Sequence, residues 1–322
     1  MVKKLICFGL AAVAALTLAA GELHPETQTF LAGMPSGLAE LQTKAIREAI
    51  AGNGALLKQV RNSRKVDTVP PSGVTTEELS FEGLPIRLYR TPGPVRVLVL
   101  YLHGGGWVLG GIPSCSRFCG ALAEQEEVAV AACDYRLAPE HPYPAALDDT
   151  VKFYDWAKQR YPGARIILAG DSAGGNLAVA AALRLLDERK KTVDGLILFY
   201  PVASLQQDRA ESWKKYGKGY ALDSGLMEAF NDAYVPDAAR RAERYVSPLG
   251  TDLKGLPKTL LITSEYDILR DQGEELGRRM KAAGVDVRML RFDGAPHIFI
   301  SMPGLDTFFD RALKESVAFT AK

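Results

Sequence analysis

Short, mostly unbroken apolar runs alternate with segments of helical periodicity along most of this chain. From residue 95 onward most of the runs lack alternating polar positions, which is typical of strands buried on both faces of a parallel sheet. The predicted strands are Glu78–Glu82, Ile86–Arg90, Val95–Leu102, Val128–Cys133, Arg165–Ala169, Gly195–Tyr200, Lys258–Thr263 and Asp286–Phe292. The first two lie close together in the chain and are expected to form an antiparallel edge.

Apolar residues at helical spacing fill the gaps between these runs. The predicted helices are Ser114–Gln125, Ala145–Tyr161, Gly174–Lys190, Arg270–Ala283 and Leu305–Phe319. Strands and helices that alternate in this way predict an α/β fold, with an eight-stranded, mostly parallel sheet flanked by helices.

Two stretches do not fit the alternation. Residues 21–75 predict an N-terminal element made of a polar linker, Glu22–Pro35, followed by helical segments at 36–50 and 55–64. Residues 203–247 run long without a strand and predict a helical cap insertion in a main domain that spans 76–322. We expect the insertion to pack with the N-terminal helices over the carboxyl edge of the sheet; a purely structural insertion is the alternative.

Residues 1–20 have the pattern of an export signal. Lys3 and Lys4 precede an apolar run, Leu5–Ala20, which ends in small residues. A buried helix or a membrane anchor is the alternative, but the run is shorter than the roughly 20 apolar residues of a membrane span. We therefore expect a periplasmic or secreted protein without a stable membrane anchor, or a cytoplasmic one if the leader does not function.

Charge and cysteine content narrow the range of partners. Lys and Arg total 39 and Asp and Glu total 38, so electrostatics gives no reason to expect nucleic acid as a partner. Beyond the leader the cysteines are Cys115, Cys119 and Cys133, an odd number that argues against a disulfide framework. Small buried side chains are favoured over metal ligands. The sequence leaves the oligomeric state open, with a homodimer among the options.

The strongest chemical signal is Gly170-Asp171-Ser172-Ala173-Gly174, which directly follows a predicted strand and precedes a predicted helix. G-x-S-x-G in this context is typical of a nucleophile elbow, although glycine-rich turns between strands and helices are also common for structural reasons. The elbow exposes the hydroxyl of Ser172 and places the amide of Ala173 at a helix N-terminus, where negative charge is stabilised.

A serine nucleophile needs a base, and the chain has four histidines: His24, His103, His141 and His297. Only His297 follows the elbow, in a loop between the last predicted strand and the last helix. In folds that carry such an elbow, the acid and then the histidine come after the serine. This order makes His297 the candidate base, and a histidine exposed on a surface loop is the alternative.

The candidate acid is Asp267, in the turn after the strand that ends at Thr263. A carboxylate there would accept the imidazole N–H and fix the tautomer of His297. Glu265 is the nearest rival. Asp271 fits the following helix better, and Asp293 lies on the wrong loop for the usual order.

The glycines of His103-Gly104-Gly105-Gly106-Trp107 follow the strand that ends at Leu102. Consecutive glycines let backbone N–H groups turn into a cavity, so we expect Gly104 and Gly105 to form an oxyanion hole with Ala173. A phosphate loop is a weak alternative, because no G-x-x-x-x-G-K-[ST] pattern is present. His103 is expected to brace this loop by hydrogen bonding.

Together these motifs resemble the bacterial hormone-sensitive lipase-like carboxylesterases. The matching segments are HGGGW at 103–107, DYRLAPEHPYPAALDD at 134–149, GDSAGGN at 170–176 and SEYDILRDQGEEL at 264–276. The resemblance implies an α/β-hydrolase core with a helical cap, and hydrolysis of short to medium acyl esters without metal or organic cofactor. It implies Ser172, Asp267 and His297 as the triad. Ile268 and Ile298 depart from the proline and glycine that are common there.

A small-molecule ester is therefore the expected ligand. Aromatic and apolar residues near the motifs are candidates for the substrate pocket, with ordinary core packing as the alternative for each: Trp107, Phe118, Tyr216, Tyr220 and Ile298. Two other functions stay open. One is an amidase or peptidase that uses the same triad, and the other is a non-catalytic ligand-binding relative.

Overall fold

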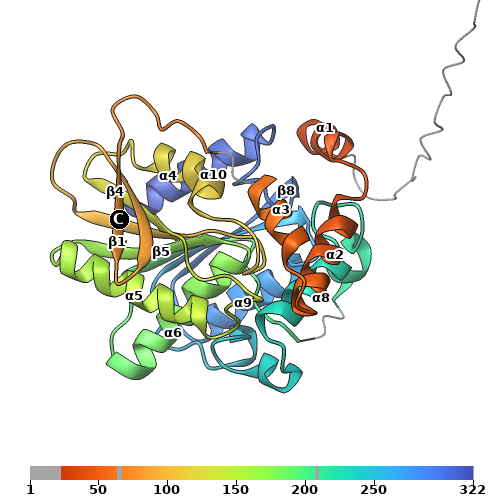
Figure 1. Ribbon diagram of the computed structural model, residues 1–322. Helices are drawn as coiled ribbons and strands as arrows, with labels where there is room; N and C mark the ends of the chain where they lie inside the picture. The colour runs from red at the N-terminus through yellow and green to blue at the C-terminus, as the bar shows by residue number, and fades with distance from the viewer. Residues whose placement is uncertain (1–22, 64–66, 207–209, 322) are drawn as a thin grey trace, which may run out of the picture.

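The computed structural model describes residues 23–63, 67–206 and 210–321, so the predicted leader lies outside the described part. Its centre is one eight-stranded sheet in the order β1-β2-β4-β3-β5-β6-β7-β8 (Figure 1). The strands are β1 Thr75–Phe81, β2 Leu84–Arg90, β3 Val97–Leu102, β4 Val128–Cys133, β5 Arg165–Asp171, β6 Gly195–Phe199, β7 Thr259–Tyr266 and β8 Val287–Pro296. The predicted strands are confirmed, with shifts of a few residues at their ends.

The pairing of the strands explains their sequence patterns. Every residue of β3, β4 and β6 is buried, because these parallel strands are covered on both faces. β2 is antiparallel to both of its neighbours, β1 and β4, whereas the remaining pairs are parallel. β1 is largely exposed at the edge of the sheet, which accounts for its polar sequence.

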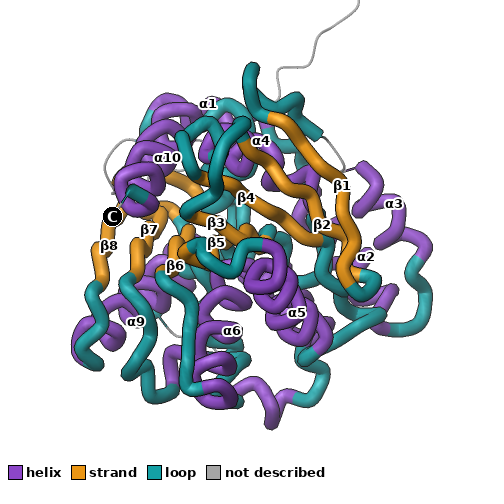
Figure 2. Tube along the Cα trace, turned by 90° about the vertical axis from the view of Figure 1, so that its left-hand side faces the viewer, coloured by secondary structure: helices purple, strands orange, loops and turns teal. Residues whose placement is uncertain are grey.

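Helices cover both faces of the sheet, as Figure 2 shows. One layer contains α4 Ile112–Leu122 and α10 Asp306–Thr320. The other layer contains α5 Ala145–Arg160, α6 Ala173–Arg189 and α9 Arg270–Ala282. Each helical layer packs on one face of the sheet and forms an apolar cluster with it. Successive residues of β3 point to opposite faces, so Leu98 and Leu100 lie in one cluster and Val97 and Val99 lie in the other.

The remaining helices gather at one end of the molecule, to the right in Figure 1. They are α1 Pro25–Gly33, α2 Leu38–Ile50 and α3 Ala55–Ser63 from the N-terminal segment, and α7 Glu211–Tyr216 and α8 Ser224–Tyr234 from the insertion, where the 3-10 turns Ala238–Ala242 and Pro248–Gly250 follow. α2 packs against α8. The side-chain amide of Asn176 donates to the carbonyls of Val202 and Val246, at 3.0 and 3.1 Å, and so ties both ends of the insertion to α6.

The expectation of a linker at Glu22–Pro35 is wrong for most of its length, because α1 occupies it. The helix begins at Pro25, whose fixed φ suits a first turn. Thr27 is fully buried, and its hydroxyl donates to the Gly294 carbonyl at 2.6 Å. A polar sequence therefore forms a helix here because it docks on β8, a contact that local patterning does not encode.

Cys115, Cys119 and Cys133 are free and buried, in agreement with the preference for small buried side chains. Within the described residues, no helix has both the length and the apolar character needed to cross a membrane.

Candidate active site

The candidate site lies where the order of the strands reverses. From β3 the chain continues to β4 on one side, whereas β5 pairs on the other side of β3. Open α/β sheets place their sites at the carboxyl ends of strands beside such a switch point. The glycine-rich loop follows β3 and the serine elbow follows β5, so the two motifs meet at this edge.

The elbow is a strained turn of one residue between β5 and α6. Ser172 has φ 54° and ψ −117°, a conformation that few non-glycine residues adopt. The Ser172 N–H donates to the Phe199 carbonyl at 2.9 Å, which holds the turn against β6. A Cβ atom at Gly174 would lie 1.9 Å from the Leu102 carbonyl oxygen, and one at Gly170 would lie 2.5 Å from the Gly174 carbonyl carbon. Glycine is therefore required on both sides of the serine.

Ser172, His297 and Asp267 form one hydrogen-bonded chain. His297 Nε2 lies 3.1 Å from Ser172 Oγ, and His297 Nδ1 lies 2.7 Å from Asp267 Oδ2. All three residues are at least nine-tenths buried. Because the carboxylate accepts the Nδ1 proton, the lone pair of Nε2 faces the serine hydroxyl. The structure thus brings together the three side chains that the sequence nominated.

The turn after β7 selects between the candidate acids. Asp267 Oδ1 accepts the Leu269 N–H at 2.8 Å, so the other oxygen is held toward His297. The rival, Glu265, accepts the Gly294 N–H at 2.7 Å and thereby supports the loop that leads to the histidine. Asp271 accepts the Ser212 N–H, and Asp293 is exposed.

The ring of Tyr200 packs beside the imidazole, with 4.5 Å between the centroids. The Tyr200 hydroxyl accepts the Ile300 N–H at 3.3 Å, which joins the end of β6 to the histidine loop. Ser264 Oγ adds a second link by donating to the Pro296 carbonyl at 2.9 Å. These contacts restrict rotation of the His297 ring and hold it in line with Ser172.

The structure corrects one predicted oxyanion donor. The Gly104 N–H donates to Asp171 Oδ1 at 2.9 Å and is therefore unavailable to a ligand. The N–H groups of Gly105, Gly106 and Ala173 have no hydrogen-bond partner among the residues that the structure describes. Gly105 and Gly106 line the cavity at Ser172, and their φ values of 107° and 62° favour glycine.

Asp171 is a residue that the sequence analysis did not single out. Its Oδ1 accepts both the Gly104 N–H and the Tyr101 hydroxyl, at 2.9 and 3.0 Å, and so joins the glycine-rich loop to the elbow. Burial raises the pKa of Asp171 to about 6, although these two hydrogen bonds act in the opposite direction. The only indication of its importance in the sequence was its position directly before Ser172.

His103 braces the same loop from behind. Its ring Nδ1 lies 2.8 Å from the Gly104 carbonyl, and the ring stacks on Tyr135 at 4.2 Å. Since a carbonyl can only accept, Nδ1 carries a proton. Burial lowers the pKa of His103, so the ring is held neutral. This arrangement is the bracing role expected for His103, and the residue does not touch Ser172.

A cavity of about 70 Å³ surrounds the Ser172 hydroxyl. Residues of the insertion and the N-terminal segment close it, together with a serine between β8 and α10. None of these five was predicted from the sequence: Gln42, Leu226, Met227, Phe230 and Ser301. Phe230 comes so close that a Cβ atom at Gly106 would lie 2.1 Å from its ring. For Leu226, Met227 and Phe230 the only signal in the sequence was the helical spacing of the apolar residues in α8, which indicates packing as readily as substrate contact.

Of the predicted pocket residues, Ile298 lines this cavity. Trp107, Phe118, Tyr216 and Tyr220 do not, and they pack in the core. The Trp107 ring stacks on Tyr234 at 4.3 Å. Phe118 lies between sheet and helices, with Phe199 at 5.1 Å. Tyr216 and Tyr220 pack around Tyr266, at 5.5 and 5.6 Å. These four residues were chosen for their positions in the sequence, but their side chains point away from the cavity at Ser172.

No group of three or more His, Cys, Asp and Glu residues in the described ranges is arranged to hold a metal ion.

Comparison with known proteins agrees with this geometry. Residues 99–301 match the model of a family with the alpha/beta hydrolase fold. This chain belongs to the hormone-sensitive lipase-like α/β-hydrolase family. It is 34% identical over 241 residues to an ethyl acetate hydrolase of Pseudomonas putida, covering 71% of this chain and 76% of that protein. It is 33% identical to an arylesterase of Saccharolobus solfataricus, covering 77% of this chain and 84% of that protein.

Solved structures of this α/β-hydrolase family are similar over nearly the whole chain. An esterase of Pyrobaculum calidifontis superposes with a TM-score of 0.78 at 31% identity, covering 92% of this chain and 97% of that one. A thermostable esterase of Pseudomonas putida gives a TM-score of 0.76 at 29% identity, covering 93% and 96%. The fold and the enzyme class, ester hydrolase, are therefore those of the family.

Proposed function

We propose that this α/β-hydrolase is a carboxylesterase in which Ser172 forms an acyl-enzyme intermediate. The hydrogen-bonded chain from Ser172 through His297 to Asp267 carries the proposal, with its separations of 3.1 and 2.7 Å. The esterases among its relatives support the substrate class.

In the first step, Ser172 Oγ attacks the ester carbonyl carbon while His297 Nε2 takes the hydroxyl proton. The carbonyl oxygen becomes an oxyanion, which accepts hydrogen bonds from the N–H groups of Gly105, Gly106 and Ala173. Ala173 is the first residue of α6, so the helix dipole adds to this stabilisation. His297 then gives its proton to the departing alcohol.

In the second step, a water molecule attacks the acyl-enzyme while His297 again removes a proton. The tetrahedral intermediate uses the same N–H groups, and its collapse releases the acid and restores the Ser172 hydroxyl. Asp267 stabilises the imidazolium in both steps by accepting the Nδ1 hydrogen bond, and keeps its own charge throughout.

We further propose a preference for short acyl chains. The cavity at Ser172, at about 70 Å³, is far smaller than the roughly 300–1,000 Å³ of pockets that hold drug-sized ligands. Phe230, Met227 and Leu226 of α8 bound it, so a longer acyl chain has to displace the cap helix.

The decisive experiment combines turnover with labelling. We expect hydrolysis of p-nitrophenyl acetate and butyrate, a sharp fall in kcat/KM for the octanoate, and stoichiometric labelling of Ser172 by an organophosphate. Ser172→Ala should abolish both turnover and labelling. Full activity of Ser172→Ala, or an intact protein that neither turns over nor becomes labelled, would exclude the proposal.

Amides with the same acyl groups separate an esterase from an amidase. A comparison of phenyl acetate with acetanilide should give turnover of the ester alone at equal concentrations. Comparable rates on the two compounds would assign the triad to amide chemistry.

We also propose that the protein is exported. The support is the basic, apolar and small-residue order of residues 1–21. Cleavage near Ala20 would leave α1 intact, since that helix begins at Pro25. Mass spectrometry of the protein from the periplasm or the medium should find a chain that starts near residue 21. A full-length chain in the cytoplasm would contradict the proposal.

A further inference from the structure

A second hollow adjoins the cavity at Ser172. It measures about 300 Å³ and lies between α1, the start of α2 and the segment 298–304. We call it the vestibule. Its apolar lining includes Phe30, Met34, Leu38, Met302 and Pro303. Gln42, Ala221 and Ile298 line both hollows, so these three residues mark the junction between them.

Gln42 is the polar residue at this junction. It is 5% exposed, and its side-chain amide has no hydrogen-bond partner among the described residues. Its amide nitrogen and oxygen are not among the fully buried side-chain atoms that lack a partner, so the amide opens onto the hollows that Gln42 lines. A bound substrate with a hydrogen-bonding atom at the junction would meet an amide that no described protein group engages.

The two hollows differ in their relation to the reacting atoms. The oxyanion loop, Gly104–Gly106, lines the cavity at Ser172 but no part of the vestibule. The alcohol oxygen of the ester has to lie within hydrogen-bond distance of His297 Nε2 in order to leave with its proton. His297 itself lines the cavity at Ser172, and its neighbour Ile298 lines both hollows. An alcohol held beside Nε2 therefore has a route past Ile298 into the vestibule, which leaves the small cavity to the acyl group.

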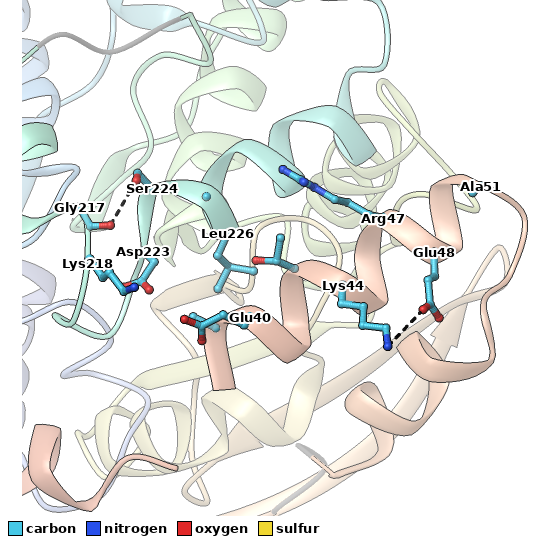
Figure 3. A pocket seen from close by; sticks show the side chains of 13 residues that line it. Glu40, Lys44, Arg47, Glu48, Ala51, Gly217, Lys218, Asp223, Ser224 and Leu226 are labelled. Atoms are coloured by element: carbon cyan, nitrogen blue, oxygen red, sulfur yellow. Dashed lines mark hydrogen bonds and ion pairs between the residues drawn. The ribbon is translucent and has the colours of Figure 1, made fainter. Parts of the chain in front are cut away.

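An adjacent face of α2 has a different character. Figure 3 shows Glu40, Lys44, Arg47 and Glu48 along a surface groove of about 750 Å³ between α2 and the start of α8. Thr43, next to Gln42 in the chain, lines this groove and neither inner hollow. Thr43 is thus a matched position on the same helix, outside the proposed binding surface.

We propose that Gln42 is a specificity-determining residue that hydrogen-bonds a polar atom on the alcohol portion of the substrate, close to the ester bond, while the apolar remainder of that alcohol occupies the vestibule. The proposal rests on the proposed esterase function. It names the substrate class as short-chain acyl esters of an apolar alcohol that carries an ether, hydroxyl or carbonyl oxygen a few bonds from the ester.

Two acetates of equal length test the hydrogen bond. The alcohol of 2-propoxyethyl acetate has an ether oxygen near the ester, and hexyl acetate has a methylene at that place. We expect the wild-type protein to have the higher kcat/KM for the ether. Gln42→Met, which keeps the length of the side chain without the amide, should lower the ether-to-hexyl ratio about fivefold, the effect of one hydrogen bond. Thr43→Val should leave the ratio unchanged.

Met34→Trp tests the vestibule without altering Gln42. The larger ring should reduce kcat/KM for hexyl acetate relative to ethyl acetate by about tenfold or more. Turnover of ethyl acetate by the wild type, with both ratios unaltered in the variants, would overturn the inference and leave the esterase function standing. Wild-type protein inactive on all three acetates and unlabelled at Ser172 would remove the esterase function, and the inference with it.

Discussion

Asp171 and Asp267 are both buried at the site, and their hydrogen-bond partners separate their roles. Asp267 accepts from the His297 ring and from the Leu269 amide, so it orients the base. Asp171 accepts from Tyr101 and from the Gly104 amide, so it orients the glycine-rich loop. The same chemical group thus holds the His297 ring in one place and the glycine-rich loop in the other.

Asp267→Asn should lower kcat by about 10⁴-fold. Its side-chain oxygen would still accept the Leu269 N–H, so the amide NH₂ would face Nδ1 of His297. That contact favours the tautomer with the proton on Nε2, which cannot accept the serine proton. Glu265→Gln is the control, because it can still accept the Gly294 N–H and should lose less than about tenfold. Equal losses in the two variants would contradict the assignment of Asp267.

Asp171→Asn should alter how stability depends on pH. The pKa of Asp171, about 6 when folded against an ordinary 3.8, means that the folded protein holds this proton more tightly than the unfolded chain. The contribution of Asp171 to the free energy of unfolding is therefore largest below about pH 4, and it is lost as the pH rises through 6. The free energy of unfolding of the wild type, minus that of the variant, should fall by up to about 3 kcal/mol between pH 4 and 7.

Urea denaturation of both proteins across this range measures that difference directly. Taking the difference cancels the titration of the other carboxyl groups, such as Glu140 and Asp271, whose pKa values are lowered. A difference that stays constant, or that rises with pH, would show that Asp171 does not titrate as inferred.

At the scale of elements, α1 supports the loop that carries the base. Its buried Thr27 bonds the Gly294 carbonyl, and Glu26 accepts from the N–H and hydroxyl of Thr307 at the start of α10. Gly294 lies three residues before His297 and also donates to Glu265. The segment 293–297 is therefore held between α1 on one side and the end of β7 on the other.

Thr27→Val should lower kcat on a small ester such as p-nitrophenyl acetate by about tenfold, with a smaller change in KM, since the hydrogen bond positions His297 and not the substrate. The loss of this buried hydrogen bond should also cost about 1 kcal/mol of stability. Thr27→Ser should restore most of the activity because it keeps the hydroxyl. Gln28→Ala, at an exposed neighbour, should have no effect; an equal fall in that variant would refute the link.

At the scale of the whole molecule, the site is assembled from segments that are distant in sequence. The elbow, the glycine loop, the acid turn and the histidine loop follow four strands of one sheet, and α2 and α8 cover them. The cap and the sheet share a continuous apolar cluster that includes Ile46 of α2, Phe230 of α8 and Leu177 of α6. We therefore expect cap and sheet to unfold together.

The reactivity of the three buried thiols, Cys115, Cys119 and Cys133, tests whether cap and sheet unfold together. Burial raises the pKa of Cys133, and a hydrogen bond with Cys119 together with burial raises the pKa of Cys115, so neither thiol reacts readily in the folded state. In a protein without its leader, a thiol reagent such as DTNB should modify almost no cysteine natively and three in denaturant. Modification and loss of activity should follow the same denaturant midpoint. Rapid native labelling of any of the three would show local opening.

The sequence by itself determined the order of strands and helices and nominated the three side chains that the structure joins by hydrogen bonds. Buried strands appear as unbroken apolar runs, and the elbow has a local pattern imposed by backbone sterics. His297 followed from there being a single histidine after Ser172. Inferences of this kind succeed because the constraint lies within a few neighbouring residues or in their order along the chain.

Only the tertiary structure decided which groups face the substrate. Gly104 and Gly106 look equivalent in sequence, but Asp171 takes the N–H of the first and leaves that of the second free. Trp107 and Tyr220 adjoin the site in sequence but point into the core, whereas Gln42, from a helix some 130 residues before Ser172, borders the cavity. The direction of a side chain depends on contacts between distant segments, and the pattern of a single segment does not record those contacts.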